Sequence, residues 1–293
     1  MPEQIQSDSV VRTIEALHSA AFNTGLGNGL YCDVDVAHHM TADVLRAHLG
    51  AGSNAGNIAI VATGVQLGDL VGAADRHFGK LSAGTARSYA TKFIAGESRV
   101  SAFTAPQTIV ALGFNGVGLS SADLAASAVL RHLLGGAASV KYGKGASLLS
   151  KAAAASGENT QLDAFNLNYR DAGLFGVLVR ASSANVRQAT NAAAKAVSSA
   201  AGSIAERDVA AAKAAAKFEL LSSFDSSSNA VAGVAASVLA GGKFSGAAAL
   251  AAKIDAVSAA DVSKLAKKLI AAKPALAVHG DTAAAPLISE IAF

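Results

Sequence analysis

Histidine and acidic side chains are the groups in this chain that could hold a catalytic metal ion. A zinc peptidase needs two imidazoles and a carboxylate on the metal, and a second carboxylate as general base for the bound water. On a helix these groups follow the pattern H-x-x-E-H or H-E-x-x-H, and neither occurs in the 293 residues. The seven histidines are His18, His38, His39, His48, His77, His132 and His279. His38 and His39 are adjacent, so in regular structure their side chains point in different directions. We therefore predict no metal ion and no catalytic residue in this chain.

A glycine-rich segment at residues 135–145 invites comparison with a phosphate-binding loop. The P-loop pattern needs Ser or Thr after Gly-Lys, but Gly145 follows Lys144. The same pattern needs glycine where Ala138 stands, and no G-x-G-x-x-G occurs anywhere in the chain. We expect a flexible connection between two helices here, with no bound cofactor.

Cysteine and serine residues offer no clear nucleophile. Cys32 is the single cysteine, which excludes an internal disulfide and a cysteine-based metal site within one chain. We expect a buried or half-buried thiol there. Ser203 with Glu206, and Ser258 with Asp261, have the spacing of capping boxes, so we expect these residues to begin helices.

Composition and charge limit the classes of function that this chain could have. Apolar residues make up 52% of the chain and aromatic residues only 5%, so we expect cores of Leu, Val, Ile and Phe with alanine at close contacts. The net charge of +3 comes from scattered Lys and Arg, which argues against nucleic-acid binding. No apolar run is long enough for a transmembrane helix. The first eight residues lack the Arg-rich pattern of a transit peptide, so we expect either no targeting segment or a mature or partial product.

A β-hairpin between residues 164 and 183 is the clearest structural signal. Phe165, Leu167 and Tyr169 alternate with smaller or polar residues, which is typical of a strand with one buried face. Residues 171–173 supply turn chemistry, and residues 174–179 form a second apolar strand. The hairpin is therefore predicted to be a central part of a sheet.

Other elements follow from periodicity and capping signals. We predict further strands at 58–65, 92–100, 108–114 and 275–279. Helices are predicted at 10–22, from Thr41 onward, and at 69–78, 120–134, 147–155, 184–200, 203–221, 226–240, 247–256 and from Ser258 onward. Residues 92–293 thus predict an α+β fold, a largely antiparallel sheet with helices packed on one face. Residues 1–78 contain one predicted strand, too few for a sheet, and 79–91 are small and polar like a linker.

Several segments, in this order and spacing, resemble the pitrilysin-type metallopeptidase superfamily. The segments are 15–22, 25–31, 60–65, 92–97, 132–136, 140–143, 165–176 and 254–262. The resemblance is to its branch of core-2 subunits in mitochondrial ubiquinol–cytochrome c reductase, respiratory complex III. Superfamily members contain two similar α+β halves joined by a linker. The resemblance therefore implies that 1–78 is the remnant of an N-terminal half, 79–91 the linker and 92–293 the C-terminal half. Active members carry H-x-x-E-H in the earlier part of the first half, which is not in this chain.

The same resemblance implies a function without catalysis. It implies a structural core subunit of complex III, peripheral on the matrix side of the inner mitochondrial membrane. Its partners would be the homologous core subunit 1 and other subunits of the complex. The alternative is an accessory, presequence-binding subunit like the α subunit of the mitochondrial processing peptidase, in which the glycine-rich loop helps to handle substrate.

Overall fold

The structure is a computed structural model that describes residues 8–31, 36, 39–84, 90–102, 105–135, 147–241 and 244–293. Cys32, His38 and nearly all of the glycine-rich segment lie outside the described residues, so the predictions made for them stay predictions.

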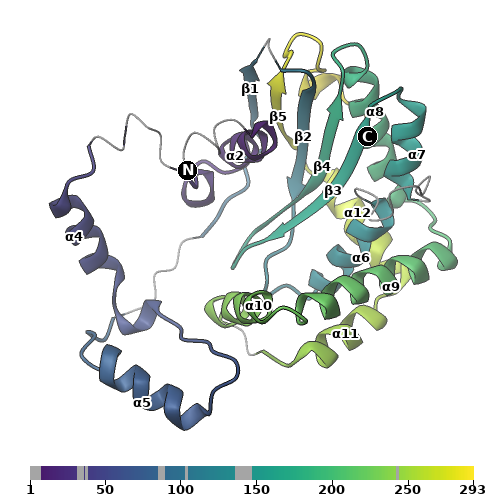
Figure 1. Ribbon diagram of the computed structural model, residues 1–293. Coiled ribbons are helices and arrows are strands. Elements are labelled where there is room, and N and C mark those ends of the chain that lie inside the picture. Colours follow the sequence, from purple (N-terminus) through teal and green to yellow (C-terminus); the bar gives the residue numbers. More distant parts are fainter. Residues whose placement is uncertain are drawn as a thin grey trace.

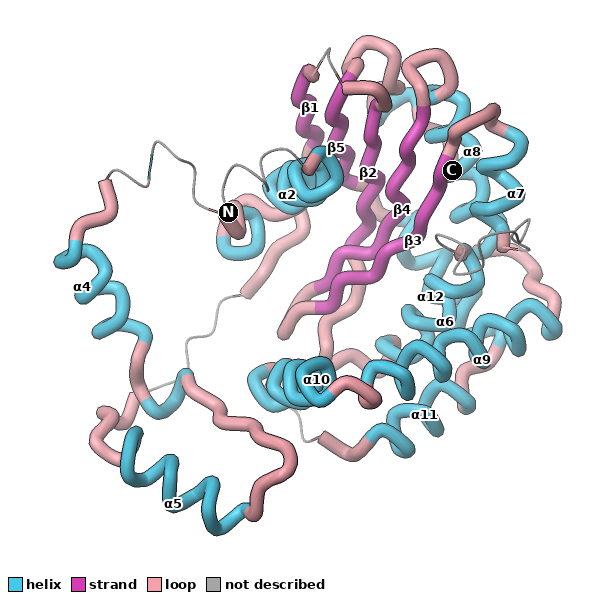
Figure 2. Tube along the Cα trace, viewed as in Figure 1, coloured by secondary structure: helices cyan, strands magenta, loops and turns pink. Residues whose placement is uncertain are grey.

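Within the described residues the strands form one five-stranded sheet in the order β1-β5-β2-β4-β3 (Figures 1 and 2). The strands are β1 (Glu97–Ser101), β2 (Thr108–Asn115), β3 (Gln161–Asn168), β4 (Gly173–Ala181) and β5 (Ala275–Gly280). Neighbours are antiparallel except β1 and β5, which run parallel. The predicted hairpin is confirmed as β3 and β4, with Phe165 opposite Gly176. The α+β, largely antiparallel class is therefore confirmed.

Helices of the second part of the chain cover one face of this sheet. Against the strands lie α6 (Leu124–Leu134), α7 (Leu148–Ala155), α8 (Val186–Ala200) and α12 (Ala259–Ala271). Outside them pack α9 (Glu206–Ser223) and α11 (Ala247–Asp255), with α10 (Ser227–Leu239) following α9. Val110, Leu112 and Phe114 of β2 belong to this core, whereas Ile109 and Ala111 belong to the core on the opposite face. This alternation is the two-residue period of a strand, and here both faces are apolar.

A helix from the first part of the chain covers the other face of the sheet. Helix α2 (Ser9–Ala21) packs on β1, β2 and β5 (Figure 1), which confirms the predicted helix at 10–22. Leu17 and Phe22 are fully buried between this helix and the strands. The prediction of helices on one face holds for residues 92–293. The second face is covered by α2 because its apolar strand side chains also need shielding from water.

Residues 39–84, which we call the arm, lie away from the sheet (Figure 1). The arm contains α4 (Ala42–Gly52) and α5 (Leu67–Phe78), and Thr41 caps α4 by accepting a hydrogen bond from the backbone N–H of Val44 at 3.3 Å. The predicted strand at 58–65 is wrong, because the structure assigns no strand to these residues. A strand needs a neighbouring backbone, and none of the described strands lies beside this segment. Short 3-10 turns occur at Gly25–Gly27, Ala55–Asn57 and Ile288–Glu290.

The first residues of the helices test the capping residues that the sequence predicts. The box of Ser258 and Asp261 is confirmed, because each side chain bonds to the other residue's backbone. The Asp261 carboxylate also accepts a hydrogen bond from the Ser258 hydroxyl, and this bond, followed by the one from the Ser258 backbone N–H, lowers the pKa of Asp261. Ser203 does not cap α9, because its first helical residue is Glu206 and Ala205 occupies the cap position. The helix predicted at 120–134, with Ser120 as its cap, begins later than expected, since α6 starts only at Leu124 after two turns. β1 begins at Glu97, five residues later than predicted.

Candidate functional site

The described histidines lie on different elements and do not converge. His18 is on α2, His132 on α6 and His279 on β5, while His39, His48 and His77 are exposed on the arm. Among the described residues no group of three or more His, Cys, Asp or Glu side chains could hold a metal ion. No helix in that part of the chain is both long and apolar enough to cross a membrane.

His18 joins α2 to the hairpin. Its Nδ1 donates to the carbonyl of Ile14 at 2.7 Å, because a carbonyl oxygen can only accept. In the neutral ring Nε2 is then the acceptor for the hydroxyl of Tyr169, 2.5 Å away. The two rings also meet edge to face at 5.7 Å, and burial raises the pKa of Tyr169. Both side chains thus help to hold α2 to the hairpin.

His132 joins α6 to α9. The carboxylate of Glu219 on α9 contacts Arg131 and lies 2.6 Å from Nε2 of His132. Burial, and then the charge of Arg131, lower the pKa of His132, while Glu219 acts in the opposite direction. This cluster positions α9 at the surface.

His279 is a buried histidine in the sheet. It is only 5% exposed, and its Nδ1 has no hydrogen-bond partner among the described residues. Burial, and then the nearby Arg12, lower its pKa below the ordinary value of 6.5. The folded chain therefore prefers the neutral ring, whereas the unfolded chain takes up a proton near pH 6.5.

We predict that the chain loses stability as the pH falls below about 6.5, in part through His279. Replacing His279 by leucine removes one protonation that favours the unfolded state. The free energy of unfolding will therefore depend less steeply on pH. His132 contributes in the same direction, so part of the dependence of the unfolding free energy on pH will remain in this variant. Urea unfolding at about pH 5.5 and about pH 7.5 measures the effect. The control is His77→Leu on exposed α5, which should keep the wild-type slope; equal slopes for His279→Leu and wild type would refute the prediction.

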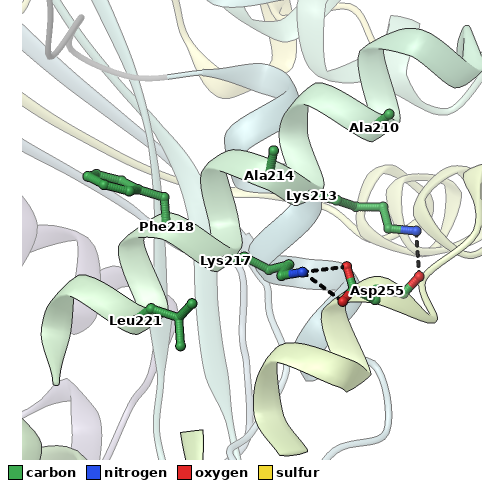
Figure 3. Close-up of a pocket in the computed structure, with 7 residues that line it drawn as sticks. All are labelled: Ala210, Lys213, Ala214, Lys217, Phe218, Leu221 and Asp255. Carbon is green, nitrogen blue, oxygen red and sulfur yellow. Dashed lines mark hydrogen bonds and ion pairs between the residues drawn. The ribbon is translucent and has the colours of Figure 1, made fainter. Parts of the chain in front are cut away.

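A shallow groove runs along α9 where it meets the end of α11 (Figure 3). Lys213 Nζ donates to the backbone carbonyls of Asp255 at 2.6 Å and Val257 at 2.9 Å. Lys217 pairs with the Asp255 carboxylate at 2.8 Å. Both lysines are thus used in fastening α11 to α9. The rest of the groove is apolar and is lined by Ala210, Ala214, Phe218 and Leu221.

Helices α9 and α10 carry further large exposed apolar side chains, which together we call the α9–α10 face. It consists of Phe218, Leu221, Val238 and Leu239. Phe218 is 74% exposed and points away from the helix into solvent (Figure 3). Helix α10 is rich in alanine and valine, yet none of its residues is buried. Exposed apolar patches of this kind are typical of protein–protein contacts.

A sequence model of the family described as the peptidase M16 inactive domain matches residues 39–216. The chain belongs to this family. Subunit 2 of the mitochondrial cytochrome b-c1 complex of Neurospora crassa is 30% identical over 99% of the chain. Mitochondrial-processing peptidase subunit alpha-2 of Dictyostelium discoideum is 28% identical over 99%. The chain spans 64% and 66% of the lengths of these two relatives.

A solved chain of complex III2 from Candida albicans, with Inz-5 bound, shares the fold. The TM-score is 0.85 at 19% identity, and the match covers 95% of this chain and 68% of that one. The likeness therefore includes most of the described M16 architecture, the sheet and its helices.

Sequence reasoning missed the α9–α10 face of this M16 domain. The sequence predicts a helix at 203–221 and assigns no exposed surface to Phe218. The available signal was the second apolar stripe on α9, opposite the stripe of Val209, Ala212 and Ala216 that is buried. Helices α6 and α11 pack against α9, yet Phe218 and Leu221 stay exposed.

Proposed function

We propose that this chain is a non-catalytic, structural core subunit of respiratory complex III. Its place would be peripheral, on the matrix side of the inner mitochondrial membrane. The observation that carries this proposal is the alignment over 99% of the chain with a protein named as subunit 2 of the cytochrome b-c1 complex. The family's description as an inactive domain supports a role in building the complex rather than in catalysis.

The proposed organisation follows the two-half plan of the superfamily. Residues 1–78 are the remnant of an N-terminal half, 79–91 the linker and 92–293 the C-terminal half. The homologous core subunit 1 is the proposed principal partner, with other complex III subunits beside it. The α9–α10 face supports such contacts, because it presents large exposed apolar side chains.

Native purification from mitochondrial membranes tests this function. A tagged chain should bring down the cytochromes of complex III, with core subunit 1 identified by mass. Phe218→Asp should reduce the recovered cytochromes at least about tenfold, because a charge placed in an apolar contact loses the energy of a central anchor. Its thermal unfolding should stay near that of wild type, since Phe218 is exposed in the chain by itself.

The matched control is Leu287→Asp, another exposed apolar residue that lies outside the α9–α10 face. This variant should retain the cytochromes. A wild-type chain that purifies without any cytochrome would reject the proposed function.

The second candidate function is an accessory subunit that binds presequences. The match to processing peptidase subunit alpha-2 over 99% of the chain favours it. Under this alternative, the chain would bind presequence peptides and raise their cleavage by a zinc-containing β partner. A cleavage assay with and without the chain separates the two functions, because a complex III scaffold should leave the rate unchanged.

A further inference from the structure

The arm is joined to the rest of the chain on one side after Tyr31 and on the other side before Thr91. A carboxylate holds the chain at the first of these points. Oε1 of Glu15 on α2 accepts hydrogen bonds from the backbone N–H groups of Leu30 at 2.9 Å and Tyr31 at 3.2 Å. Hydrogen bonds to an ionised acceptor are stronger than neutral ones, so this carboxylate fixes the outgoing chain on α2.

A second carboxylate holds the chain where it returns. Asp171 lies in the turn between β3 and β4, and its Oδ2 accepts a hydrogen bond from the backbone N–H of Thr91 at 2.8 Å. The Thr91 hydroxyl donates to Oδ1 of the same carboxylate at 3.1 Å. Two residues later, Phe93 forms a β-bridge with Phe22, and their rings meet edge to face at 5.9 Å. The incoming chain is thus tied to the hairpin turn and to the end of α2.

The turn that follows α2 brings the outgoing chain back to Glu15. It is the 3-10 turn Gly25–Gly27, in which Gly25 has a φ of 63°. A Cβ on Gly27 would lie 1.7 Å from the backbone oxygen of Phe22, so only glycine fits there. The two glycines therefore allow the reversal that places the backbone of residues 30–31 against the Glu15 carboxylate.

His18 and Tyr169 connect the two points of attachment. Glu15 and His18 lie three residues apart on α2 and so share one side of that helix. Tyr169 and Asp171 both lie in the turn between β3 and β4. Nε2 of His18 and the Tyr169 hydroxyl are 2.5 Å apart. One hydrogen bond therefore joins the helix that holds the outgoing chain to the turn that holds the incoming chain.

We propose that Glu15, His18, Tyr169 and Asp171 act as one clamp that holds both connections of the arm. Fixing the two ends of so long a loop costs conformational entropy, which the hydrogen bonds to the two carboxylates offset. Loss of one carboxylate releases only its own connection, whereas loss of the His18–Tyr169 bond loosens both. The clamp is a property of the chain by itself and does not depend on the proposed place in complex III.

Hydrogen exchange resolved to single amides tests the outgoing side on the full, isolated chain. Glu15→Ala should accelerate exchange at Leu30 and Tyr31 at least about tenfold, because their N–H groups lose their acceptor. Glu15→Gln keeps an acceptor oxygen and should restore most of the protection. Glu158→Ala, which removes an exposed carboxylate outside the clamp, is the matched control and should change neither amide. Unchanged exchange at both amides in Glu15→Ala would overturn the proposal.

Trypsin cleavage after Lys92 tests the incoming side, because this exposed lysine follows Thr91 directly. Asp171→Ala should raise the rate of that cleavage at least about threefold, since the chain is no longer held at Thr91. Asp171→Asn keeps an acceptor oxygen and should stay near the wild-type rate. Cleavage after Arg46 on exposed α4 is the internal reference and should not change. Equal cleavage after Lys92 in Asp171→Ala and wild type would contradict the clamp.

Tyr169→Phe distinguishes one clamp from two separate contacts. This variant keeps the aromatic ring and removes only the hydroxyl that bonds to His18. Exchange at Leu30 and cleavage after Lys92 should both become at least about threefold faster, with the amides of β2 as the reference for the stability of the sheet. A change on one side only, or on neither side, would reject the single clamp.

Discussion

Replacing Gly176 by alanine will destabilise the sheet by about 3 kcal/mol or more, because the position leaves no room for a side chain. Gly176 lies on β4, opposite Gly113 on β2 and Phe165 on β3. A Cβ there would lie 2.2 Å from the backbone oxygen of Leu112 and 2.4 Å from the ring of Phe165. A backbone oxygen inside a sheet cannot move without breaking the ladder. Urea unfolding measures the loss, with β4 protection in hydrogen exchange as a second readout.

Gly72→Ala on α5 is the matched control for this substitution. A Cβ at Gly72 meets no atom within 4 Å, and alanine is the better helix former. The control should therefore unfold at the wild-type urea concentration or slightly above it. A Gly176→Ala chain with wild-type stability would show that the strands do not pack at the distances described here.

Replacing Leu17 by alanine will cost about 3 kcal/mol and release α2 from the sheet. Leu17 is 0% exposed, and a Cβ placed on Gly113 of β2 would lie 3.0 Å from its Cδ2, so the leucine fills the space above that glycine. Truncation leaves a cavity that the rigid sheet cannot close. The hydrogen bond of His18 with Tyr169 would then weaken, since both groups depend on the position of α2.

Limited proteolysis together with urea unfolding measures this effect. The Leu17→Ala chain should be cut near α2 faster than wild type and should unfold at lower urea. Leu30→Ala is the matched control, because Leu30 is 82% exposed and its truncation should cost almost nothing. Similar behaviour of the two variants would contradict the packing of α2 on the sheet.

The predictions of secondary structure were confirmed where neighbouring residues alone determine the element. The β3–β4 hairpin needs only its alternating side chains and a turn, and the Ser258 box needs two residues one helical turn apart. The Ser203 prediction failed, although its spacing is the same, because nothing local decides which of several small residues ends the preceding loop. The surface formed by Phe218 and Leu221 could not be predicted, since burial depends on which neighbours arrive from elsewhere.

The amino-acid sequence by itself determined the element types over residues 92–293, the α+β class and the lack of a zinc-binding motif, because these depend on residue type and short-range period. Only the tertiary structure decided that α2 covers the second face of the sheet and that His18, His132 and His279 have separate surroundings. It also decided that residues 58–65 are not a strand. The physical reason is the same in each case. Strand pairing and burial depend on contacts between segments far apart in the chain, and the local spacing of apolar residues does not specify which segments will meet.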